Sequence, residues 1–228
     1  MSSMIKSRKV LILGMITAVF YIALNMYIRH SLGYADMLDI ISGETFKEYK
    51  SIVLYIGCLF PFISFIILLE YYYQMGGSYM ALIRTGDRTH WAGRLLITEA
   101  GLILIHVSFI FIAETLAYIL TFCTVSLRIE TLPVAIHMCL SCMTVGIMYM
   151  LGRMYMNTGN CIITIMSLIL MVPLLIIVYF PRLGDLYVLN MLYAYGPKDL
   201  YIKLPESLAV LSFFGIIYIK KTKRADML

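Results

Sequence analysis

Residues Leu95 to Thr124 read LLITEAGLILIHVSFIFIAETLAYILTFCT. A helix needs about 20 mostly apolar residues to cross the hydrocarbon core of a bilayer, and this run is longer than that. It nevertheless contains three ionisable residues, Glu99, His106 and Glu114, and such groups are costly in lipid. The stretch therefore predicts a membrane-spanning helix with one face turned away from the lipid.

The composition of the whole chain supports lipid as its solvent. Hydrophobic residues make up 61% of the 228 residues and charged residues 14%, whereas a soluble domain has roughly 45–50% apolar and about 25% charged residues. The net charge of +5 lies in short basic runs at the ends of apolar segments, where it sets membrane orientation and does not predict a nucleic-acid partner. We therefore expect an all-α membrane protein embedded in a lipid bilayer.

Further apolar runs of similar length predict six transmembrane helices in a single transmembrane domain covering 1–228. Pro61 and Pro173 lie within two of the runs, where each is expected to kink its helix or to free a carbonyl. The predicted spans are about 10–28, 52–69, 95–124, 132–151, 161–180 and 205–219.

The distribution of basic residues predicts that both termini are cytoplasmic, in a multi-pass protein of the cell membrane. With that orientation the inner segments are rich in arginine and lysine, as the positive-inside rule requires. The outer segments mix a few basic residues with most of the acidic ones. The basic residues predicted to be inside are Lys6, Arg8, Lys9, Arg84, Arg88, Arg94, Arg153, Lys220, Lys221, Lys223 and Arg224.

The outer segment 181–206 reads PRLGDLYVLNMLYAYGPKDLYIKLPE and is too polar to span the bilayer. Its leucines and tyrosines alternate with charged and amide residues, a pattern typical of interfacial segments. We expect it to lie at the outer interface or to form a re-entrant segment between spans 5 and 6.

The longest predicted cytoplasmic loop, 71–94, contains a basic and amphipathic stretch. Tyr79, Leu82 and Ile83 recur at helical spacing before a turn at Gly86-Asp87. One interpretation is a helix lying flat on the membrane, with Trp91 in the aromatic belt. The other is a short helix that docks a soluble motor protein.

The segment from about 70 to 95 resembles the permease subunit of type-2 ABC transporters, and the six-span topology is similar too. In that family an acidic residue ends the second span, and a glycine-containing loop, a short coupling helix and a basic lead-in to the third span follow. The chain departs from the usual Glu-x-x-x-Gly-Thr form, because Gly76, Gly77 and Ser78 follow Glu70 at a greater distance. The residues that correspond to the ATPase-coupling elements are Glu70, Gly76, Gly77, Tyr79, Leu82, Ile83, Arg84, Arg88 and Trp91.

The resemblance implies the partners of the chain. No GxxxxGK[ST] loop is present, so ATP and Mg²⁺ would bind to separate cytoplasmic ABC ATPase subunits and no cofactor to this chain. A second permease copy, identical or homologous, would complete the pathway. The family's small bacterial plasma-membrane members export amphipathic or lipid-like substrates, including antimicrobial peptides, or confer bacteriocin immunity. Glu70 would orient the loop through Arg84 or Arg88.

The three ionisable residues of the third span fall within about an 80° arc of one helix face at roughly 100° per residue. We consider a polar substrate path, a proton relay, and a set of interhelical hydrogen bonds that fixes packing. Glu99 is a candidate to pair with Arg94 or Arg153, and Glu114 with His137 of the fourth span.

The sequence predicts neither a catalytic site nor a metal site. It has no HExxH and no GxSxG motif, and its five cysteines lie in or beside apolar runs, where they pack as small apolar residues. We therefore expect a transport subunit and not an enzyme. The alternatives are a proton-coupled secondary transporter or channel that uses Glu99, His106 and Glu114, and a membrane anchor that recruits a partner through the 71–94 loop.

The predicted orientation is testable with an impermeant thiol reagent on intact cells. In a cysteine-free background, Ser78→Cys in the 71–94 loop should stay unlabelled until the membrane is permeabilised, because the loop is cytoplasmic. Ser42→Cys in the outer segment 31–51 is the positive control. Labelling of Ser78→Cys in intact cells would place the loop outside and exclude docking to a cytoplasmic ATPase.

Overall fold

The computed structural model describes residues 2–32, 52–76, 88–123, 131–171 and 200–224, and every regular element in these ranges is helical. The α-helices are α1 (Ser2–Leu32), α3 (Ile52–Gly76), α5 (Arg88–Phe122), α6 (Thr131–Arg153), α7 (Thr158–Met166) and α9 (Leu200–Arg224). A π-helix, η2 (Ser167–Met171), continues directly from α7. The all-helical class expected from the sequence is confirmed for these residues.

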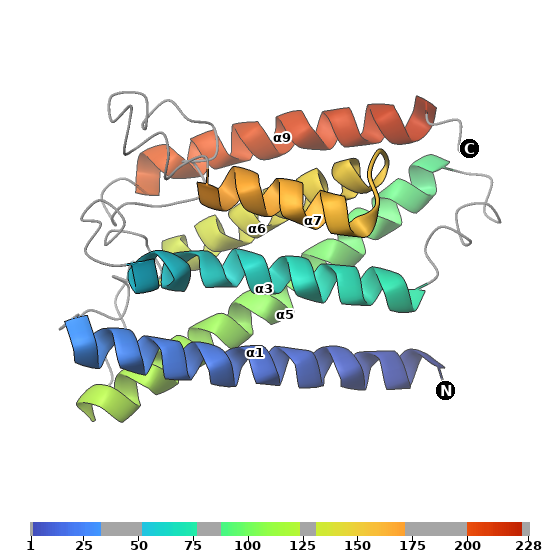
Figure 1. Cartoon of the computed structure of the whole chain (residues 1–228). Coiled ribbons are helices and arrows are strands. Elements are labelled where there is room, and N and C mark those ends of the chain that lie inside the picture. The colour runs from blue at the N-terminus through green and yellow to red at the C-terminus, as the bar shows by residue number, and fades with distance from the viewer. Residues whose placement is uncertain (1, 33–51, 77–87, 124–130, 172–199, 225–228) are drawn as a thin grey trace.

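The helices alternate in direction (Figure 1). As a result α1 begins, and α9 ends, at the same end of the bundle, which we call the N/C end. The end of α3, the start of α5 and the turn from α6 to α7 lie at this end too (Figure 1). The bundle therefore places the two helix ends that flank residues 77–87 beside both ends of the described chain.

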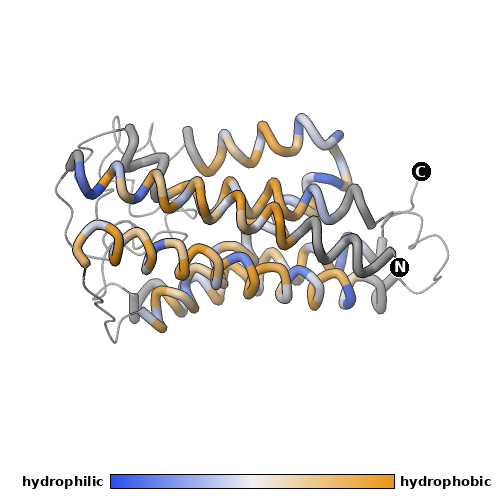
Figure 2. Tube along the Cα trace, turned by 90° about the horizontal axis from the view of Figure 1, so that it is seen from below, coloured by the Kyte–Doolittle hydropathy of each residue, from blue (hydrophilic) through white to orange (hydrophobic). Residues whose placement is uncertain are grey.

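Apolar residues predominate along the length of the helices, as the orange of the tube in Figure 2 shows. Large apolar residues face outward on several helices, for example Ile97 with 75% of its surface exposed and Leu132 with 69%. Such helices are stable where hydrocarbon is the solvent. Three described segments are long and apolar enough to cross a membrane, namely Leu11–His30, Ala92–Phe122 and Thr131–Arg153.

Many hydroxyl groups are satisfied within their own helix. Besides Ser64, which bonds the Phe60 carbonyl and also contacts His106, the hydroxyl donates a hydrogen bond to the carbonyl four residues earlier in eight cases, which is how serine and threonine avoid an unpaired polar group in lipid. The donors are Thr17, Thr98, Ser108, Thr115, Thr121, Thr144, Ser212 and Thr222. These eight hydroxyl groups therefore need no hydrogen-bond partner on a neighbouring helix.

The core forms around α6, which contacts α3, α5, α7 and α9. Its membrane-length window is 61% buried, compared with 28% for α1 and 33% for α5. Phe65 of α3, Ile110 of α5 and Val145 of α6 are fully buried within the largest apolar cluster. Helix α1 lies at the margin of the bundle, where it packs extensively along α5 and α3 (Figure 1).

The helix ends correct two predicted boundaries. The 71–94 loop is shorter than expected, because α3 continues past Glu70 to Gly76 and α5 begins at Arg88. Residues 71–76 read YYYQMG and contain no proline that would end the helix. Gly77, Tyr79, Leu82, Ile83 and Arg84 lie outside the described residues.

The second correction concerns the last span. We expected it to begin at Pro205, but α9 begins at Leu200 and contains Pro205 within its second turn. Pro205 has no backbone N–H and therefore removes one internal hydrogen bond of that turn, yet the helix continues through it. The predicted interfacial segment 181–206 thus loses its final residues to α9, and 181–199 lies outside the described residues.

Candidate functional site

Buried polar residues between the helices form the candidate site. Glu99, His106 and Glu114 have at most 2% of their surface exposed, so the shared face of α5 is turned inward as the sequence predicted. Each contacts a different helix, because α5 crosses the bundle diagonally (Figure 1). Along α5 the face meets α6 first, then α3, then α1.

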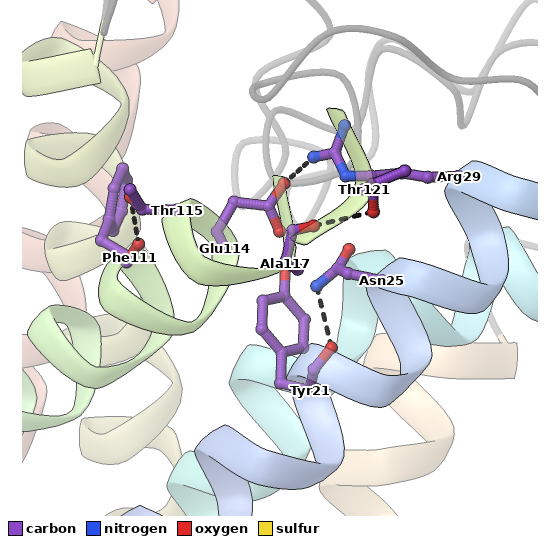
Figure 3. Close-up of polar contacts among 8 residues, drawn as sticks. All are labelled: Tyr21, Asn25, Arg29, Phe111, Glu114, Thr115, Ala117 and Thr121. Carbon is purple, nitrogen blue, oxygen red and sulfur yellow. Dashed lines mark hydrogen bonds and ion pairs between the residues drawn. The ribbon is translucent and has the colours of Figure 1, made fainter. Parts of the chain in front are cut away.

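Glu114 forms a buried ion pair with Arg29, which lies near the end of α1 (Figure 3). Both side chains are fully buried. The Arg29 guanidinium also lies over the ring of Tyr118, 5.2 Å from its centroid, in a cation–π contact. On the same side of α1, Asn25 donates a hydrogen bond of 3.1 Å to the carbonyl of Tyr21 (Figure 3).

The sequence does not predict this pair, because from the sequence alone Arg29 is interpreted only as the residue that ends the first span. Arg29 follows the apolar run directly, which is the usual position of a residue that reaches the headgroups. The only available signal was complementary charge, since a buried carboxylate needs a cationic partner. The expected partner, His137, instead lies 3.2 Å from Ser207 of α9 through its Nε2 atom.

His106 joins α5 to α3 at the proline of that helix. Its Nε2 atom lies 2.8 Å from the carbonyl oxygen of Pro61. Because a carbonyl only accepts hydrogen bonds, Nε2 carries the proton in this contact. The Ser64 hydroxyl is 3.4 Å from the same nitrogen, and the ring of Phe65 lies 5.6 Å from the imidazole, centroid to centroid.

Glu70 joins α3 to α6 near the N/C end. Its Oε2 atom accepts a hydrogen bond from the Tyr149 hydroxyl, and it lies 3.8 Å from Nε of Arg153. Glu70 is 6% exposed and Tyr149 is fully buried. The helix that leads into residues 77–87 is thereby fixed to the central helix of the bundle. Arg84 and Arg88, the partners expected for Glu70, have no described side chain.

Glu99 is the exception among these acidic residues. It is 1% exposed, and neither of its carboxylate oxygens has a hydrogen-bond partner in the described part of the chain. The two arginines expected to pair with it are placed elsewhere: Arg94 is exposed and Arg153 lies beside Glu70. The described residues also contain no group of three or more His, Cys, Asp or Glu side chains that could hold a metal ion.

The arrangement can transmit motion and hold charge, but the polar groups are spread along α5 and are not convergent on one reacting atom. Three contacts join α5 or α3 to a neighbouring helix through charged or imidazole groups. Comparison with known proteins gives no further assignment, since no family model, curated protein or solved structure matches the chain.

The Arg29–Glu114 pair predicts a strong and asymmetric response to mutation. Glu114→Gln should destabilise the protein by about 3–5 kcal/mol, because it leaves a buried guanidinium without its counter-charge, whereas the double change Arg29→Met with Glu114→Leu should restore most of the loss. Thermal unfolding of the purified protein in detergent measures both effects.

Thr115→Val is the matched control, because the Thr115 hydroxyl bonds only the Phe111 carbonyl of its own helix in the contacts described. It should change the unfolding temperature little. If Glu114→Gln were as stable as Thr115→Val, the ion pair would contribute nothing to holding α1 on α5.

Proposed function

We propose that the chain is the membrane-spanning permease subunit of an ATP-driven ABC transporter, with six spans and both termini cytoplasmic. Separate cytoplasmic ATPase subunits would bind to the 71–94 region, and a second permease copy would complete the pathway. The expected transport direction is export, and the expected substrate is an amphipathic peptide or a lipid-like molecule crossing the plasma membrane of a bacterium.

The observation that carries this proposal is the contact of Glu70 with Tyr149 and Arg153. Glu70 corresponds to the acidic residue at the second span in the resembling family. A displacement of the segment after α3 would be passed through this contact to α6, which packs against four other helices. An ATPase that pushes on residues 77–87 would therefore act on the centre of the bundle and not on a peripheral helix.

The proton-coupled transporter remains the alternative, but it receives less support. A relay through Glu99, His106 and Glu114 requires groups that exchange protons with one another. The described contacts of His106 and Glu114 are instead with α3 and α1. A relay would have to break an ion pair and a hydrogen bond before it could operate.

The proposal predicts that an ATPase with a Walker A motif purifies with the tagged chain in mild detergent. The pair Leu82→Asp and Arg84→Glu should weaken that association and uncouple ATP hydrolysis from transport, because both changes lie in the expected docking helix. Leu186→Asp with Arg182→Glu, in the segment expected outside, is the control and should preserve both. Normal binding and coupling in the first double variant would refute the docking role.

Tyr149→Phe tests the contact between α3 and α6 separately. The change keeps the ring and removes one hydrogen bond to a carboxylate, a loss of about 1.5–3 kcal/mol. Substrate-stimulated ATP hydrolysis should fall, because a displacement of α3 would no longer be passed to α6 through this contact, while the amount of bound ATPase stays constant. Tyr155→Phe, at a tyrosine that is 66% exposed, should have no effect; an unchanged Tyr149→Phe protein would show that Glu70 does not transmit motion.

A further inference from the structure

The carboxyl group of Glu99 fills a notch in the surface of α6. The notch exists because position 146 is a glycine: a Cβ atom added there would overlap the Glu99 carboxylate. The same Cβ position is 3.2 Å from the ring of Phe65 on α3. The carboxyl group of Glu99 therefore lies against the backbone of α6 at Gly146, and the Phe65 ring of α3 borders the same position.

The surroundings of Glu99 provide no positive charge in the described contacts. The described titratable groups that neighbouring helices bring to this part of the bundle include Cys139, Cys142 and Tyr149 of α6, Glu70 of α3 and Tyr218 of α9. The nearby cation, Arg153, lies at Glu70. An ionised Glu99 would thus be buried without a counter-charge, which costs several kcal/mol even after relaxation.

We propose that Glu99 is a proton-binding site that is occupied when α5 and α6 are packed together. A proton is the one counter-charge that needs no added volume in this notch. It comes from hydronium, forms an O–H bond on one carboxylate oxygen and leaves a water molecule behind. When α5 and α6 separate and water reaches the carboxyl group, the proton returns to water and the carboxylate is solvated.

The site links the proton to the conformation of the bundle. The packed state binds one proton more than the separated state, so a rise in pH favours separation of α5 from α6. This inference does not depend on an ATPase partner. It holds for an ATP-driven permease, whose cycle would then take up and release a proton, and for the alternative transporter as well.

Infrared spectroscopy of the purified protein in lipid bilayers tests the proposal at neutral pH. The protein should show the carbonyl stretch of a protonated carboxylic acid, above the amide I band, and this band should shift downward in D₂O. Glu99→Gln, which resembles the neutral acid in shape, should remove the band. If the difference between the two proteins contained only carboxylate stretches, Glu99 would be ionised and the proposal would be wrong.

Substitutions of two glycines, Gly146 and Gly101, provide a second way to assign the acid band to Glu99 without changing Glu99 itself. Gly146→Ala pushes mainly against the flexible end of the Glu99 side chain, so the protein should fold with the carboxyl group displaced and the acid band moved in frequency. Gly101→Ala, on α5 itself, has nothing within 4 Å of the added carbon and should leave the band in place. An acid band unaffected by Gly146→Ala would not belong to Glu99. Neither measurement involves ATPase, so failure here and failure of co-purification are separate results.

Discussion

The absence of water around a membrane-embedded helix is the constraint on which the rest of this structure depends. Partners inside the protein stabilise polar groups there, because an unpaired group in hydrocarbon costs several kcal/mol. Hydroxyl groups meet this demand within their own helices. The charged residues cannot, so Arg29 with Glu114 and Glu70 with Tyr149 determine which helices lie together.

The sequence was sufficient to predict the helices, because hydropathy and length report directly on lipid exposure. Each of the six predicted spans overlaps a described helix, and three of these helices are long and apolar enough to cross a membrane. The inward face of α5 was also predictable, since it follows from helical periodicity alone. The pairing of Glu114 was not predictable, because a helix that crosses the bundle diagonally meets different neighbours along one face. Periodicity says which residues share a face and nothing about which helix lies opposite.

The predicted helix boundaries were wrong where the composition fits both helix and loop. Residues 71–76 read as loop because they follow a glutamate and lead to glycines, yet the helix continues through them. Glu70 is tolerated there since Tyr149 and Arg153 satisfy it, a contact made by residues far away in the chain. Gly146 carried no signal at all in the sequence, and its importance becomes visible only when α5 lies against α6.

The ion pair between α1 and α5 joins residues 85 positions apart in the chain. A ribosome therefore releases α1 into the bilayer well before the acidic partner of Arg29 has been made. Until then Arg29 can reach the headgroups from its place at the helix end, whereas Glu114 lies eight residues before the end of α5 and lacks its counter-charge. The ionised form of Glu114 is thus stabilised by a helix that was made earlier, and assembly of the bundle acquires an order from N-terminus to C-terminus.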